Sequence, residues 1–137
     1  MLMSTIKRAG FAVIGSACLI GSATAADMTG AQIKELISGK SVYQEFDATS
    51  TGGAGQGVIY YAADGTAVYK TAKGAIWHGT WTIKENTACT DWKESPNNPC
   101  TRYDKQGETV TTFNVATGKP RGKIAKIVAG NAEKIGP

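Results

Sequence analysis

A chain of 137 residues is long enough for one hydrophobic core and too short for two, so a single globular domain is expected. The sequence has 15 Lys and Arg against 11 Asp and Glu, a net charge of +4. Beyond Lys7 and Arg8 the basic residues are spread singly, and this pattern gives no support for a nucleic-acid-binding surface.

Residues 1–25 have the three parts of a cleavable secretory signal. Lys7 and Arg8 supply the positive charge, residues 11–20 the apolar run, and Ala-Thr-Ala at 23–25 the small side chains that the peptidase accepts. We therefore expect the mature chain to begin at Ala26 and to be periplasmic or secreted, with residues 26–137 forming one β-rich domain. Loss of Lys7 and Arg8 leaves 13 basic and 11 acidic residues, a net charge of +2.

Two other interpretations of residues 1–25 have less support. The apolar run is well short of the roughly 18–20 residues that span a bilayer, and glycines interrupt it, so no stable membrane span is expected after cleavage. Lipidation of Cys18 is an alternative to cleavage after Ala25, because small residues precede that cysteine. Apolar residues continue past Cys18, however, and Gly15 stands where an aliphatic residue is expected.

The mature chain opens with a predicted helix at 30–38. Thr29 and Gln32 have the spacing of a capping box, Met28 and Ile33 that of a hydrophobic staple, and Gly39 is placed to end the helix in a left-handed conformation. Runs rich in Val, Ile, Thr and aromatic residues then alternate with turn signals every eight to twelve residues or so. These predict strands at 41–46, 57–62, 66–71, 75–83, 88–92, 100–103, 108–115 and 122–128.

The turns between these strands indicate an antiparallel meander. Asp64-Gly65 is the strongest hairpin signal, because both residues tolerate positive φ. Residues 47–56 are almost without apolar side chains, so we expect a mobile loop there, able to act as a lid at a barrel mouth. The predicted fold is mainly β: a short N-terminal helix plus an antiparallel meander that forms a small lipocalin-like β-barrel or curled sheet.

With Cys18 removed, two cysteines remain. Cys89 and Cys100 flank a segment rich in turn-forming residues, and exported domains mature where thiols oxidise. We predict a disulfide between them. A metal site is not expected, since the pair lacks CxxC spacing and His78, the single histidine, cannot complete a set of four ligands.

Aromatic residues are the best candidates for a binding site. Five rings fall within three consecutive predicted strands and can therefore cluster. They either fill the core of the barrel or line an apolar cavity that accepts a small ligand or a side chain of a partner. The candidate ligand-binding residues are Tyr60, Tyr61, Tyr69, Trp77, His78 and Trp81.

The sequence shows no catalytic constellation. No serine lies in a nucleophile motif, so an enzyme would have to depend on His78, for which an exposed strand position is the simpler interpretation. No enzymatic activity and no cofactor are predicted.

Several motifs resemble those of a family of small exported bacterial proteins of unknown function. The matching residues are 57–66 (GVIYYAADGT), which carry Tyr-x-x-x-Asp-Gly-Thr, 79–83 (GTWTI), which carry Gly-x-Trp, Cys89, 127–131 (IVAGN) and the opening helix at 28–33 (MTGAQI). The resemblance covers nearly all of the mature chain and implies a periplasmic all-β protein without an assigned activity. A looser similarity is to the periplasmic lysozyme inhibitors, which are also small disulfide-bearing barrels, but their strand motifs differ.

We therefore expect a periplasmic, non-enzymatic binding or accessory protein that acts through a barrel mouth or a sheet face. Its partner would be an unknown small ligand or an envelope protein. The alternative is an inhibitor of an envelope hydrolase such as lysozyme.

Overall fold

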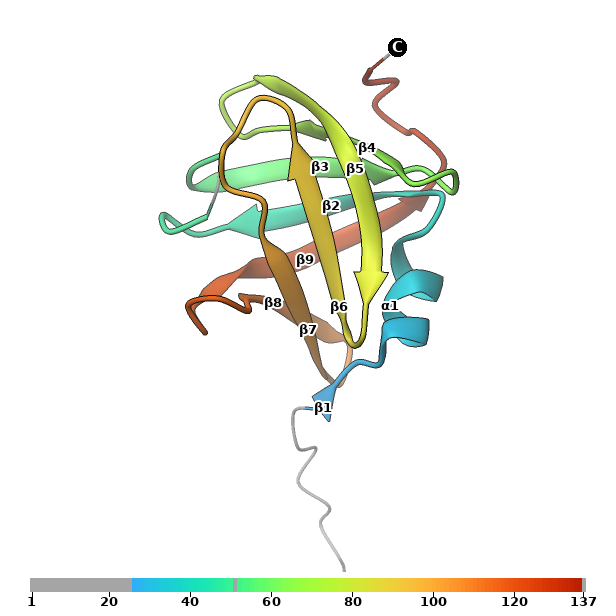
Figure 1. Ribbon diagram of the computed structural model, residues 1–137, viewed down its shortest axis with the longest axis vertical. Helices are drawn as coiled ribbons and strands as arrows, with labels where there is room; N and C mark the ends of the chain where they lie inside the picture. The colour runs from blue at the N-terminus through green and yellow to red at the C-terminus, as the bar shows by residue number, and fades with distance from the viewer. Residues whose placement is uncertain (1–25, 51, 137) are drawn as a thin grey trace, which may run out of the picture.

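The computed structural model of the protein, which describes residues 26–50 and 52–136, is a closed antiparallel β-barrel of eight strands with one short helix (Figure 1). The strand order is β7-β6-β5-β4-β3-β2-β9-β8, and pairing between β7 and β8 closes the ring. A two-residue strand, β1, adds to the edge of β7. The elements are β1 (Ala26–Asp27), α1 (Gly30–Ile37), β2 (Lys40–Phe46), β3 (Gly55–Tyr61), β4 (Thr66–Lys70), β5 (Ile76–Lys84), β6 (Thr87–Trp92), β7 (Cys100–Gln106), β8 (Thr109–Asn114) and β9 (Pro120–Ala129).

The predicted barrel is confirmed, and each predicted strand overlaps one of β2–β9. Local signals account for this agreement. The capping box forms in both directions, with the Thr29 hydroxyl accepting from the Gln32 amide and the Gln32 side chain accepting from the Thr29 amide. Gly39 follows the helix at φ 70°, and Gly65 turns the β3–β4 hairpin at φ 93°.

Alternation along the strands divides the side chains between core and surface. Val42 and Phe46 of β2 and Tyr103 of β7 point into the barrel with the core-facing residues Ile33 and Ile37 of α1. The outer face of β2, β3 and β4 carries a second, smaller cluster around Tyr43 and Val58. No strand or helix is assigned to the tail at 130–136, but its buried Ile135 covers this cluster.

The ladder between β6 and β7 is the shortest in the barrel. It consists of two residue pairs, Ala88 with Thr101 and Cys89 with Cys100. A disulfide joins Cys89 and Cys100 at this seam, as the sequence predicts. Beyond the disulfide, β1 pairs with the free edge of β7. The Met28 amide extends this pairing by donating to the Tyr103 carbonyl at 2.8 Å.

The two ends of the barrel are closed differently, and Figure 1 shows α1 and the 47–56 loop on opposite sides. At the helix end, α1 packs on β2, β5 and β6. At the loop end, the chain is anchored to β9: the Asp47 amide and the Ser50 hydroxyl both donate to the Arg121 carbonyl. The β3 ladder starts at Gly55, two residues earlier than expected. The predicted mobility of this loop stays a prediction.

Candidate functional site

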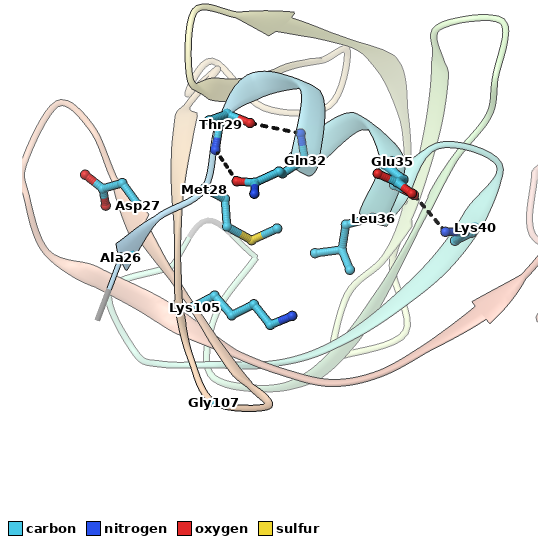
Figure 2. A pocket seen from close by; sticks show the side chains of 10 residues that line it. All are labelled: Ala26, Asp27, Met28, Thr29, Gln32, Glu35, Leu36, Lys40, Lys105 and Gly107. Atoms are coloured by element: carbon cyan, nitrogen blue, oxygen red, sulfur yellow. Dashed lines mark hydrogen bonds between the residues drawn. The ribbon is translucent and has the colours of Figure 1, made fainter. Parts of the chain in front are cut away.

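A groove lies at the helix end, between α1, β1 and the β7–β8 turn (Figure 2). Its volume is about 810 Å³, and it is open to solvent. We call it the mouth groove, because strand ends of the barrel form its border: Lys40 begins β2, and Lys105 and Gly107 lie at the β7–β8 hairpin. Its lining is Ala26, Asp27, Met28, Thr29, Gln32, Glu35, Leu36, Lys40, Lys105 and Gly107.

Two apolar side chains give this groove its binding potential. Met28 and Leu36 point into the opening in Figure 2, one from the segment before α1 and one from its last turn. Both are in contact with the barrel core, where Met28 is buried and Leu36 is half-buried. A ligand in the groove would therefore meet apolar surface continuous with the core, in a volume within the range typical of small-molecule sites.

Charged groups border the same groove. The Lys40 ammonium donates to the Glu35 carbonyl at 2.7 Å, where it helps to satisfy the C-terminal end of α1. Asp27 forms an ion pair with Arg102 on the outer face of β7. Lys105 follows Thr101 and Tyr103 in the inward alternation of β7 and points into the opening in Figure 2.

Four of the six residues predicted to bind a ligand face the barrel core: Tyr61, Tyr69 and Trp81 are buried in it, and the half-buried Trp77 packs against it. The Tyr69 ring lies at the centre of this cluster, with its centroid 5.5 Å from that of Trp77 and 5.7 Å from that of Trp92. Trp81 packs edge-on against Tyr61 at 5.5 Å, and its indole nitrogen donates to the Ala62 carbonyl at 2.8 Å. The face of β5 that carries Trp77 and Trp81 is thus turned inward.

The other two candidates lie on the outside. Tyr60 alternates with the inward Tyr61 and is half-buried. The His78 ring nitrogen Nδ1 lies 2.9 Å from a carboxylate oxygen of Glu94, whose second oxygen accepts from the His78 amide. These bonds to His78 lower the pKa of the Glu94 carboxyl. The six residues do not form one site, and none of them lines the mouth groove.

Two further residues, Lys105 and Arg121, are not among the candidates drawn from the sequence, although alternation along β7 and β9 indicates the direction of their side chains. Lys105 shares a face of β7 with the buried Tyr103. Arg121 is 8% exposed and points into the barrel, where its Nη1 donates to the Thr101 hydroxyl at 2.6 Å. The strand predicted at 122–128 starts one residue after Arg121, whereas β9 begins at Pro120, so the sequence pattern does not assign this side chain to the barrel interior.

The part of the chain that the structure describes contains no group of three or more His, Cys, Asp or Glu side chains arranged to hold a metal ion. Within residues 26–50 and 52–136, no helix is long and apolar enough to cross a membrane. Comparison of the chain with family models, curated proteins and solved structures gives no match. The resemblances drawn from the motifs therefore stay predictions.

Proposed function

We propose that the mature protein is a periplasmic, non-enzymatic binding protein that holds a small, largely apolar ligand in the mouth groove. The observation that supports this proposal is a solvent-open groove of about 810 Å³ whose lining includes the buried Met28 and the half-buried Leu36, both packed on the core. The helix leaves part of the barrel mouth open here, so a ligand can bury apolar surface without unfolding any element.

The test uses the mature domain, residues 26–137, and the anionic fluorophore 1-anilinonaphthalene-8-sulfonate as the probe. Wild-type protein should increase the fluorescence of the probe with a saturable dependence on concentration. Leu36→Gln should weaken this binding by about tenfold, because burial of a leucine side chain contributes roughly 1.5 kcal/mol or more.

Val128→Gln is the matched control, since Val128 is 37% exposed on β9 and does not line the groove. Its affinity for the probe should equal that of the wild type. Absence of saturable binding to the wild-type domain, or equal affinities for Leu36→Gln and the wild type, would contradict the proposal.

Inhibition of an envelope hydrolase remains the alternative proposal. A muramidase assay with and without the mature domain tests it directly. Unchanged lysis at a large excess of the domain would dispose of this alternative for lysozyme.

A further inference from the structure

Lys105 carries a positive charge on the inner side of the mouth groove. Its register partners are Ala26 on β1 and Val110 on β8, and Val110 is buried in the barrel core. Residues that lie opposite each other in an antiparallel ladder point to the same face of the sheet. Lys105 therefore lies on the inward face of β7, and Figure 2 shows its side chain projecting into the opening from that strand.

The Lys105 ammonium has no partner in the part of the chain that the structure describes. Within residues 26–50 and 52–136, ion pairs are made by His78 and Arg102, and the lysine side chain that donates a hydrogen bond is that of Lys40. Lys105 itself is exposed to solvent at the border of the groove. Its ammonium is thus free to bind an anion that enters the groove.

The two acidic residues of the groove lining do not neutralise Lys105. Asp27 is turned to the outer face of β7, where it forms an ion pair with Arg102. Glu35 lies in the last turn of α1, where the Lys40 ammonium donates to the Glu35 carbonyl at 2.7 Å, and Figure 2 shows these two residues beside each other. Each of these negative charges therefore has a positive group nearby, whereas Lys105 has no negative group beside it.

Apolar surface and a free positive charge border the same groove. Met28 and Leu36 provide the apolar surface, which is continuous with the barrel core. A hydrocarbon chain gains free energy when it leaves water for such a surface, and a carboxylate gains free energy beside an ammonium. The single charge of Lys105 favours a monovalent headgroup over a dianion, because Glu35 in the same lining repels a second negative charge. This combination matches an amphiphile with one apolar chain and one negative charge.

We propose that the mouth groove binds a single-chain amphiphile with one carboxylate, whose hydrocarbon chain lies on Met28 and Leu36 and whose carboxylate binds the Lys105 ammonium. This inference rests on the proposed function and adds to it the charge of the ligand and the residue that selects it. The apolar chain supplies most of the affinity, and Lys105 discriminates against neutral and cationic molecules with the same chain.

The experiment compares three molecules with the same octyl chain: octanoate, 1-octanol and octyltrimethylammonium. Each is titrated into the isotope-labelled mature domain at neutral pH and low ionic strength, and the amide chemical shifts give both the dissociation constant and the place of binding. All three should shift the amide resonances of Met28 and Leu36. Octanoate should bind about fivefold more tightly than 1-octanol, the effect of a partly exposed ion pair, and octyltrimethylammonium should bind more weakly than either. High salt should reduce the advantage of octanoate, because it screens the charges.

Three variants test whether Lys105 is the source of this preference. Lys105→Met removes the charge and keeps a long apolar side chain, so octanoate and 1-octanol should bind it with equal affinity. Lys105→Arg should keep the preference for octanoate, because the positive charge remains. Lys93→Met is the matched control, since Lys93 is an exposed lysine that does not line the mouth groove, and its preference should equal that of the wild type.

The outcomes separate this inference from the proposed function. If none of the three octyl compounds shifts the resonances of the groove, the proposed function and this inference both fail. If all three bind the groove equally well, or if Lys105→Met keeps the preference for octanoate, the groove binds apolar chains but Lys105 does not select the ligand, and this inference alone is overturned.

Discussion

Gly79 determines how closely β5 and β6 approach each other. A Cβ at this position would lie 2.0 Å from the Asp91 carbonyl oxygen and 2.9 Å from the Trp92 ring. Two residues later in the same motif, the Trp81 indole is buried and donates to the Ala62 carbonyl. The Gly-x-Trp sequence therefore has a packing role: glycine lets one strand and one ring approach, and tryptophan fills the space beside them.

Gly79→Ala should consequently lower the free energy of unfolding by about 2–3 kcal/mol, since the added methyl group meets backbone atoms that can move only if the ladder opens. Urea denaturation followed by tryptophan fluorescence measures the change. Thr80→Ala is the control, because the Thr80 side chain is exposed on the outer face of β5. A loss of less than about 0.5 kcal/mol for Gly79→Ala would show that the strands accommodate a methyl group there.

The raised pKa of a buried tyrosine leads to a second prediction at the scale of single residues. Unfolded tyrosines ionise near pH 10, whereas burial raises the pKa of Tyr69 to about 12. The folded state therefore keeps a proton that the unfolded state releases, so this stability is fully present below pH 10 and is lost as the pH rises from 10 to 12. The loss due to Tyr69 should reach roughly 2 kcal/mol by pH 11.5.

Denaturation curves at several pH values between 8.5 and 11.5, together with absorbance at 295 nm, test this dependence. Tyr69→Phe should show a shallower loss of stability over the same range, which separates the phenol from the lysines that also titrate there. Identical slopes for the wild type and Tyr69→Phe would refute the assignment.

At the scale of elements, the β6–β7 seam is where closure of the barrel depends least on backbone pairing. Two residue pairs and the disulfide between Cys89 and Cys100 join these strands, while β5 and β6 share six pairs. The N-terminal segment completes the closure, since β1 pairs with the far half of β7. A covalent bond at this place therefore holds together the strands that hydrogen bonds join least.

The double variant Cys89→Ser/Cys100→Ser should lose about 3 kcal/mol of stability, the value that closure entropy gives for a loop with a sequence separation of 11. Hydrogen exchange should show the loss of protection first at Thr101 and Ala88, rather than in β2 and β3. Wild type treated with reductant provides the comparison without substitution. Unchanged stability in both forms would mean that the seam does not depend on the disulfide.

At the scale of the whole molecule, the helix end of the barrel carries a groove that is open to solvent, whereas the loop end is anchored to β9. The mouth groove lies beside α1, and at the loop end Ser50 is buried against β9. Residue Ala26, the predicted first residue of the mature chain, begins β1 and lines the mouth groove. Cleavage after Ala25 would thus place the new amino terminus at the border of the proposed binding site.

Expression of the full chain in a Gram-negative host should yield a periplasmic protein whose amino-terminal sequence is Ala-Asp-Met-Thr. Amino-terminal sequencing and intact mass measure this outcome. Substitution of Ala25 by a bulky residue such as Phe should block cleavage, because the peptidase accepts only small side chains there. A lipid-modified amino terminus at Cys18 would instead support the alternative fate of the segment.

Local sequence signals determined the elements. Thr29 and Gln32 fixed the start of α1, glycines at positive φ marked the turns, and alternating apolar residues marked the strands, because each of these features depends on interactions within a few residues. The disulfide between Cys89 and Cys100 also followed from sequence, since these are the two cysteines that remain after the predicted cleavage.

Only the tertiary structure decided which side chains meet. Closure of the barrel turned Tyr69 inward and left Tyr60 and His78 outside, and it brought Arg121 against Phe46 and Thr101 from distant strands. The mouth groove likewise depends on how α1 lies across strand ends that are far apart in the chain. Such features depend on strand register and on barrel closure. A register shift of one residue turns every side chain of a strand to the opposite face, so no local pattern determines which side chains meet.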